Sequence, residues 1–380
     1  MKRKITYLPV LIAASIFIIQ GCKKYESPPE CGGNNITVTT QKVLVTGLND
    51  PRGLKFGPDG NLYVAEAGVG GTNLSTTCAQ VVAPVGPYLG SNTGSRISMI
   101  DRNGVRTTVA DNLPSSVTTP ATGSGIQGIA DVAFVGNTLY GLLAGGGCSH
   151  GVPDIPNQVF KVHPDKTWSM IANYSEYLMT HPVKDPNPAD FEPDGTPYSM
   201  INSGGTLYVV EPNHGEIDRI STGGNISRLI DVSAHEGHIV PTCIVNHDDN
   251  FYVGNLDVFP IVQGSSSVFK ITPQGQISVF AKGFETILGI AFDANNRLYV
   301  LECTVGQDAL TPGFGDIVRV DPSGQKTVIA SGFHLPTAMT FGPDGSLYVS
   351  DWGIGPPGMG QIVQVSFKCE YVQPDTKNLN

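Results

Sequence analysis

Asn61-Leu62-Tyr63-Val64 is the stretch of sequence that decides the fold, because the chain contains five further copies of it. Those copies are Thr138-Leu139-Tyr140-Gly141, Thr206-Leu207-Tyr208-Val209, Asn250-Phe251-Tyr252-Val253, Arg297-Leu298-Tyr299-Val300 and Ser346-Leu347-Tyr348-Val349. Successive tyrosines of the six copies lie 77, 68, 44, 47 and 49 residues apart. Self-similarity at such spacing indicates a repeat architecture, with one supersecondary unit per copy.

Each copy follows a turn and a short apolar run, and the turns are clearest in Phe56-Gly57-Pro58-Asp59-Gly60 and Phe341-Gly342-Pro343-Asp344-Gly345. Proline presets the backbone for a tight turn, aspartate hydrogen-bonds its own backbone, and glycine adopts the left-handed conformation. The pattern therefore predicts six hairpins, each made of the first two strands of a repeat.

A second hairpin alternates with the first. Its alternating apolar residues and glycine-closed turns are found in 97–109, 159–166, 217–224, 268–275 and 317–324. Four short antiparallel strands per repeat are typical of a propeller blade. We therefore expect an all-β, six-bladed β-propeller over residues 36–371, followed by a short tail over 372–380.

The sixth copy stops early, which suggests how the ring closes. Residues 361–367 supply a third strand, and the chain then ends without a fourth, whereas 36–45 is rich in β-forming residues. An N-terminal strand that completes the last blade would remove an exposed sheet edge. It would also bring Cys31 beside Cys369, and we expect a disulfide between them.

The composition excludes several other classes. The chain of 380 residues has 46 Gly and 28 Pro and a net charge of −10. This abundance of turn residues argues against helical bundles. An acidic chain is also poorly suited to phosphate backbones, so we expect no nucleic-acid partner.

The N-terminus has the pattern of an export signal. Lys2, Arg3 and Lys4 precede an apolar run of about a dozen residues, too short to span a membrane. The run ends at Ile19-Gln20-Gly21-Cys22, which resembles a bacterial lipobox. We expect residues 1–21 to be removed, Cys22 to be lipidated and 22–35 to form a tether. The protein would then be membrane-anchored in the cell envelope; an ordinary secretory signal is the alternative.

Export favours disulfide bonds. Besides Cys22, Cys31 and Cys369, the chain has Cys78, Cys148, Cys243 and Cys303. The strand order places these four on one face, in the pairs Cys78–Cys148 and Cys243–Cys303; free buried thiols are the alternative. The sequence contains no C-x-x-C pair, so a zinc ribbon has no support.

At this level the chain resembles the ScyD/ScyE family, within the wider six-bladed propellers that include NHL repeats and SMP-30/gluconolactonase lactonases. The resemblance rests on segments 47–54, 61–68, 84–88, 94–97 and 109–115. It covers most of residues 40–367. It implies the propeller fold, while members of the family have no settled activity.

The residue just after each second strand is expected to project toward the mouth of the central channel. The six copies align Glu66, Leu143, Glu211, Asn255, Glu302 and Asp351 at this position. A Ca²⁺ ion would relieve the repulsion among such acids, and the resemblance to lactonases implies an ion at this mouth. Raised carboxyl pKa values or a water-filled funnel are the alternatives.

Other candidates for the same face are histidines and one tryptophan. His214, His235, His238 and His334 fall in the connections of that face, and Trp352 follows Asp351. His235 and His238 have the spacing of a weak metal motif, and a solvated loop is the favoured interpretation. Trp352 is either a stacking platform for a ligand or a capping hydrophobe.

Two functions remain open. The first is a lipid-tethered, monomeric propeller that binds or scaffolds a glycan, a protein or a small molecule at its loop-rich face. The second is a Ca²⁺-dependent lactone or ester hydrolase, with Glu66, Glu211, Asn255, Glu302 and Asp351 as ligands. Oxidation with a soluble quinone has little support, and the sequence contains no nucleophile elbow or Walker loop.

Overall fold

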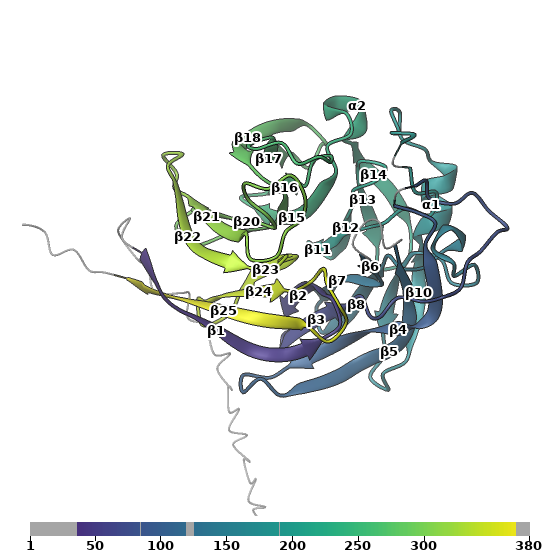
Figure 1. Cartoon of the computed structure of the whole chain (residues 1–380), viewed down its shortest axis with the longest axis horizontal. Helices are drawn as coiled ribbons and strands as arrows, with labels where there is room; N and C mark the ends of the chain where they lie inside the picture. Colours follow the sequence, from purple (N-terminus) through teal and green to yellow (C-terminus); the bar gives the residue numbers. More distant parts are fainter. Residues whose placement is uncertain (1–35, 84, 119–124, 190, 370–380) are drawn as a thin grey trace, which may run out of the picture.

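Six antiparallel sheets stand in a ring around a central axis, with the first strand of each sheet innermost (Figure 1). This computed structural model describes residues 36–83, 85–118, 125–189 and 191–369. The expected six-bladed β-propeller is confirmed. The expected signal, tether and tail, with Cys22 and Cys31, lie outside the described residues.

Blades one to three follow in chain order. Blade one contains β2 (Pro51–Phe56), β3 (Leu62–Glu66), β4 (Leu89–Ile100), β5 (Arg106–Val117) and the short β6 (Ile126–Gln127). Blade two contains β7 (Ile129–Val135), β8 (Thr138–Leu143), β9 (Gln158–Val162) and β10 (Trp168–Asn173). Blade three contains β11 (Ser199–Ser203), β12 (Thr206–Glu211), β13 (Glu216–Ser221) and β14 (Ile226–Asp231).

Blades four to six complete the ring. Blade four contains β15 (Pro241–His247), β16 (Asn250–Asn255), β17 (Ser266–Ile271) and β18 (Ile277–Phe284). Blade five contains β19 (Ile287–Phe292), β20 (Leu298–Glu302), β21 (Gly315–Val320) and β22 (Lys326–Phe333). Blade six contains β23 (Ala338–Phe341), β24 (Leu347–Asp351), β25 (Gly360–Cys369) and, from the other end of the chain, β1 (Ile36–Leu48).

The pairing of β1 with β25 confirms the predicted closure of the ring. The two strands run antiparallel from Ile36 opposite Cys369 to Leu48 opposite Gly360, and they lie side by side in Figure 1. The pair thus gives blade six a fourth strand.

A shared contact fixes the hairpin turns. The Asp59 carboxylate accepts hydrogen bonds from the Asn61 backbone N–H at 3.1 Å and from the Tyr63 hydroxyl at 3.0 Å. Asp344 receives the equivalent bond from Tyr348 at 3.1 Å. A Cβ at Gly57 would lie 2.6 Å from the Tyr63 ring, so the first glycine of the turn leaves room for that ring.

The same tyrosines join neighbouring blades. Five of the six pack against a phenylalanine of the next blade, with ring centroids 4.4–5.2 Å apart, in the pairs Tyr63–Phe134, Tyr208–Phe251, Tyr252–Phe292, Tyr299–Phe341 and Tyr348–Phe56. Offset and edge-on ring contacts of this kind stabilise beyond the burial of area. The repeated Tyr therefore determines both the hairpin and the contact between blades.

Helices are minor elements of the described chain. One of them is the short α1 (Tyr174–Thr180), capped by Asn173, which accepts the Glu176 N–H. A second one, α2, spans Ser233–Glu236. Over the described residues, the search for a helix with the length and apolarity to cross a bilayer found none.

Candidate functional site

The candidate site lies on the face where the connections after β3, β8, β12, β16, β20 and β24 emerge, which we call the loop face. Chain segments entering the next blade also emerge there, since four-stranded blades begin and end on one side. Glu66, Leu143, Glu211, Asn255, Glu302 and Asp351 are each the last residue of the second strand. Their predicted structural equivalence is therefore confirmed.

The orientation of these side chains differs from the expectation. Three of them accept a hydrogen bond from the backbone N–H 17 residues earlier: Glu66 from Asn49, Glu302 from Glu285 and Asp351 from His334. Glu211 accepts the N–H of Thr196, 15 residues earlier. These acids thus cap the segment that enters their own blade.

Glu66 shows where the side chain points. Its carboxylate accepts hydrogen bonds from the Arg96 guanidinium at 3.0 Å and from the Ser98 hydroxyl. Both donors lie in the third strand of the blade. The Arg106 guanidinium lies 3.4 Å away. Asn255 likewise accepts the Ser267 N–H at 2.7 Å and donates to the Ile239 carbonyl at 2.9 Å. The acids therefore face their own sheets instead of sharing the axial mouth.

The electrostatics of the acids follow from their burial. Burial raises the pKa of Glu302 to about 7 against the opposing hydrogen bond from Glu285, and it also raises the pKa of Asp351. Leu143 is buried in the apolar core between blades one and two. Among the described residues, no group of three or more His, Cys, Asp or Glu side chains is placed to hold one metal ion.

Tyr198 closes the axial channel on the loop face. It precedes β11 of blade three, and its hydroxyl donates to the Thr337 carbonyl of blade six at 2.8 Å. Blades three and six are opposite in a ring of six, so the side chain crosses the axis. The Arg52 guanidinium carbon of blade one lies 6.0 Å from the centroid of the Tyr198 ring.

Beneath Tyr198 the channel narrows to a cavity of about 30 Å³, which has room for ordered water but not for a sugar or a lactone. Every blade lines it with its first strand, through Gly53, Asp131, Ser199, Cys243, Gly289 and Ala338. The Asp131 carboxylate lies 3.9 Å from the Lys55 ammonium and accepts the Met200 N–H at 2.8 Å. A Cβ at Gly53 would collide with this carboxylate, so Asp131 requires the glycine.

Apolar side chains surround Tyr198 at the mouth. Leu288, Cys303 and Leu335 form a buried cluster, and four partly buried side chains pack on it: Tyr198, Leu256, Leu310 and Ile354. They come from blades three to six. The four partly buried side chains therefore give the mouth a partly open apolar surface.

The histidine and tryptophan candidates are distributed over the loop face. His214 is buried, donates its Nε2–H to the Glu192 carbonyl at 2.9 Å, and stacks on Phe191. His235 lies exposed in α2, and His238 follows it. The His334 ring stacks on Trp352 with centroids 4.9 Å apart. The structure thus pairs Trp352 with His334.

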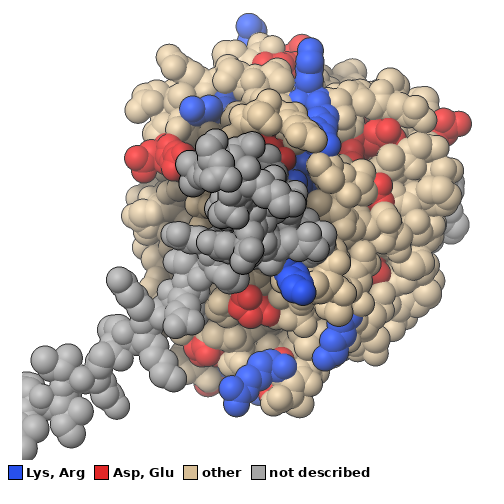
Figure 2. All heavy atoms as spheres, turned by 90° about the vertical axis from the view of Figure 1, so that its left-hand side faces the viewer, with Lys and Arg blue, Asp and Glu red and all other residues tan. Residues whose placement is uncertain are grey.

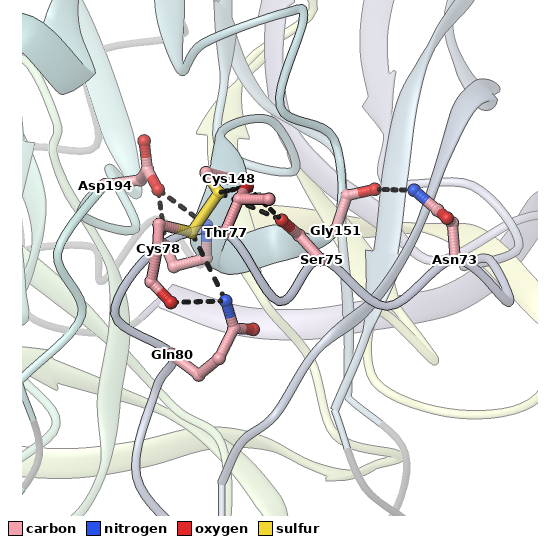
Figure 3. The surroundings of a disulfide bond; sticks show 9 residues. Asn73, Ser75, Thr77, Cys78, Gln80, Cys148, Gly151 and Asp194 are labelled. Atoms are coloured by element: carbon pink, nitrogen blue, oxygen red, sulfur yellow. Dashed lines mark hydrogen bonds between the residues drawn. A yellow bond between two sulfur atoms is a disulfide. The ribbon is translucent and has the colours of Figure 1, made fainter.

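The Cys78–Cys148 disulfide predicted from the strand order is confirmed (Figure 3). It joins the connection of blade one to the short 3-10 turn Cys148–His150 of blade two. The next residue, Ser149, donates its N–H and its hydroxyl to Asp194 at 2.8 and 2.6 Å. The disulfide and these hydrogen bonds together connect loops of blades one, two and three.

A set of residue types known from hydrolases lies beside this disulfide. The Ser116 hydroxyl is 3.1 Å from His150 Nδ1, and His150 Nε2 is 3.7 Å from the Glu192 carboxylate. All three residues are buried, which denies a substrate access. Burial also lowers the pKa of His150 to about 4, so the ring is neutral. We interpret this group as a structural contact between loops.

The expected Cys243–Cys303 disulfide is wrong. Both residues are free, buried thiols. Cys243 faces the axial cavity from β15, whereas Cys303 lies in the apolar cluster with Leu288 and Leu335. The strand order correctly placed both residues near the loop face but could not give the direction of each side chain. Burial raises the pKa of each thiol to about 12.

The side of the molecule shown in Figure 2 has no large patch of one charge sign in its described part. Lysine, arginine, aspartate and glutamate are interspersed there among uncharged residues. Such a surface gives no directional field for a highly charged partner.

The comparisons with known proteins support the fold. No protein-family model and no curated protein matches the sequence. A solved protein of unknown function from Bacteroides thetaiotaomicron shares 13% identity at a TM-score of 0.53, over 88% of this chain and 73% of that one. A putative oxidoreductase (glucose dehydrogenase) from Thermus thermophilus shares 17% at 0.52, over 86% and 99%.

A gluconolactonase from Xanthomonas campestris is also similar, with 10% identity and a TM-score of 0.52, over 88% of this chain and 96% of that one. Identities this low show a shared propeller fold and nothing about the reaction.

Sequence reasoning missed Tyr198 and Leu288 at the mouth. Arg52, Tyr198 and Leu288 each lie one position before a residue that lines the channel, namely Gly53, Ser199 and Gly289. The repeat alignment contains this signal, because the channel-lining position recurs in every first strand.

Proposed function

We propose that this protein is a binding or scaffolding module of the cell envelope, anchored to the membrane through a lipid on Cys22, with its ligand site at the axial mouth of the loop face. The observation that carries the proposal is the position of Tyr198, which covers the channel and is surrounded by partly open apolar side chains. Because Tyr198 closes the channel, a ligand would bind on the surface above Tyr198 and not inside the channel.

The hydrolase alternative has less support from the same geometry. Its expected ligands Glu66, Glu211, Asn255, Glu302 and Asp351 are occupied by backbone groups of their own blades. A Ca²⁺ ion would have to displace these hydrogen bonds, and each displaced, buried N–H would lose its acceptor. We therefore place metal-dependent hydrolysis second.

Trp352 offers a direct measurement of binding, because it follows β24 beside Ile354 of the mouth. Replacing the other tryptophan, Trp168→Phe, leaves Trp352 as the single emitter. Panels of glycans, small organic acids and lactones are titrated against this variant. We expect a saturable change in fluorescence that Tyr198→Ala removes, whereas Glu236→Ala in α2 leaves it unchanged.

The result that would overturn the proposal is turnover of a lactone without a stable complex. Loss of that turnover on addition of a chelator, and its return with Ca²⁺, would establish the hydrolase instead. The anchor is tested separately in the full chain. Labelled palmitate should appear in the wild-type protein and be absent from Cys22→Ser, which should leave the membrane fraction.

A further inference from the structure

The axial mouth has two chemically different halves. Blade one contributes Arg52 and Gln127, which line a small cavity beside Tyr198. Blades three to six contribute the apolar half, made by Leu256, Leu288, Leu310, Leu335, Ile354 and the Tyr198 ring. A surface divided in this way is complementary to a molecule that is itself divided into a polar and an apolar part.

Arg52 is the charged group of the polar half. Its side chain is buried, with 6% of the residue exposed. Nη2 donates to the Ile126 carbonyl, whereas Nε has no hydrogen-bond partner among the described residues. An unpaired N–H of a buried guanidinium is costly, because it loses water without gaining an acceptor.

The cavity next to Arg52 has the size of the missing acceptor. Its volume is about 10 Å³, close to what one water molecule or one ligand oxygen needs. Its wall also includes Ala67, the 127–130 segment, Pro197 and Tyr198. An oxygen atom placed there would be within reach of the arginine while the rest of the ligand stayed above Tyr198.

We propose that the mouth binds an organic anion with an apolar body, whose acidic oxygen enters the cavity beside Arg52 and whose apolar part covers Leu310, Leu335 and Ile354. This inference rests on the proposed binding function and names the chemical class of its ligand. Guanidinium groups favour carboxylate and sulfonate oxygens because the hydrogen bonds are charge-assisted.

Asp50 makes the binding sensitive to pH. It is fully buried two residues before Arg52, accepts the Gly355 N–H at 3.1 Å and has one unpartnered oxygen. Burial raises the pKa of Asp50 to about 7, although the charge of Arg52 opposes the rise. A bound anion would favour the neutral carboxyl, so binding takes up a proton and is tighter at pH 6 than at pH 8.

Other charged groups around this pair come from every neighbouring blade and do not change the sign of the effect. Each of them has its own partner: Glu66 pairs with Arg96 and Arg106, Asp131 with Lys55, and Asp351 with His334. The nearby thiol of Cys303 is uncharged, because burial raises its pKa to about 12. Asp50 is the one among them whose oxygen is both buried and unpartnered in the described structure.

The test compares two probes that differ in charge, octanesulfonate and octanamide, by calorimetric titration of the full chain. We expect octanesulfonate to bind about tenfold more tightly. Arg52→Gln should reduce this preference to about twofold or less, and Leu310→Ser, at a partly buried position of the mouth, should weaken both probes. Arg297→Gln is the matched control, because Arg297 is equally buried but pairs with Asp293 on the opposite face.

The outcomes separate this inference from the proposed function. Equal affinity for both probes, with loss of both in Leu310→Ser, would overturn the anionic ligand class and keep the mouth as a binding site. An anion preference that survives Arg52→Gln, or no binding of octanesulfonate at all, would also overturn it. If Arg52→Gln does not fold, Arg52→Lys and Asp50→Asn replace it. Lysine should lower the preference, and asparagine should abolish its pH dependence.

Discussion

Glu66 illustrates at the residue scale how burial changes the meaning of a carboxylate. The sequence offers an acid at the end of a strand, which is also what a metal ligand looks like. In the folded chain it is inaccessible and accepts hydrogen bonds from Asn49, Arg96 and Ser98. Removing it would leave two arginines and one backbone N–H without their acceptor.

Glu66→Ala should therefore destabilise the protein, by about 3 kcal/mol, because breaking a buried ion pair leaves an uncompensated charge. Glu66→Gln should cost less, since the amide oxygen can still accept. Urea unfolding followed by circular dichroism measures both. A Glu66→Ala variant as stable as Glu236→Ala, a change at an exposed position of α2, would show that the ring of acids is not structural.

Glu216 and Asp218 form a second residue-scale case, at the junction of blade three with α1. Both are buried in β13, Arg228 contacts Glu216, and the Tyr174 hydroxyl donates to Asp218 at 2.6 Å. Burial and mutual repulsion raise the pKa of Glu216 to about 9, and burial raises that of Asp218 to about 7. The pair therefore keeps a proton at neutral pH.

Stability should consequently fall as the pH rises. The unfolded carboxyls lose their protons near pH 4, whereas the folded pair holds one up to pH 7–9. In this range the folded state binds more protons, and its free energy of unfolding decreases by about 1.4 kcal/mol per pH unit for each such proton. Urea midpoints at pH 6, 7.5 and 9 measure the slope.

Asp218→Asn should flatten this dependence, because the amide cannot release a proton. The matched control is Asp165→Asn, an exposed turn residue whose pKa is lowered by hydrogen bonds from Thr167. It is ionised throughout the range and should leave the slope unchanged. An identical slope in wild type and Asp218→Asn would mean that the buried pair does not control the pH dependence.

At the scale of elements, the hairpins could be predicted from sequence and the side chains at the mouth could not. A turn such as Phe56–Gly60 is determined by its own residues, so its signal is local. The direction of Glu66 depends on Asn49 and Arg96, and that of Tyr198 depends on a carbonyl in the opposite blade. Such contacts exist only after the ring has formed, so no short pattern encodes them.

The contact between Tyr299 and Phe341 tests the link between hairpin and blade packing. Tyr299 is buried, its hydroxyl donates to Asp293 at 3.0 Å, and its ring meets Phe341 of the next blade at 5.2 Å. A double-mutant cycle with Tyr299→Leu and Phe341→Leu should give a coupling free energy of about 1 kcal/mol.

The junction of blades two and three provides the control. There the first strand of blade three ends at Ser203, without a phenylalanine, and Asp131 bonds the Met200 N–H instead. Tyr140→Leu and Ser203→Ala should show no coupling. Equal coupling in both cycles would indicate that the aromatic pair contributes no more than general burial.

At the scale of the whole molecule, stability depends on joining the two ends of the chain. Every other blade is one continuous segment, whereas blade six combines β23, β24 and β25 with β1. The junction of blades six and one adds hydrogen bonds from Thr337 to the Pro51 carbonyl and from Ser350 to the Arg52 carbonyl, both at 2.6 Å. Closure thus also positions the segment that carries Arg52.

A chain that lacks residues 36–48 should therefore lose cooperative unfolding and aggregate, because β25 becomes an open edge and the blade loses its outer strand. A circular permutant that begins at Asp50 and joins the end of β25 to β1 through a short linker keeps every strand while it cuts the chain between blades six and one. It should retain the wild-type circular dichroism and one sharp thermal transition. Analytical ultracentrifugation and thermal melts distinguish the two proteins. A truncated protein that stays monomeric and melts like the wild type would show that the ring does not need β1.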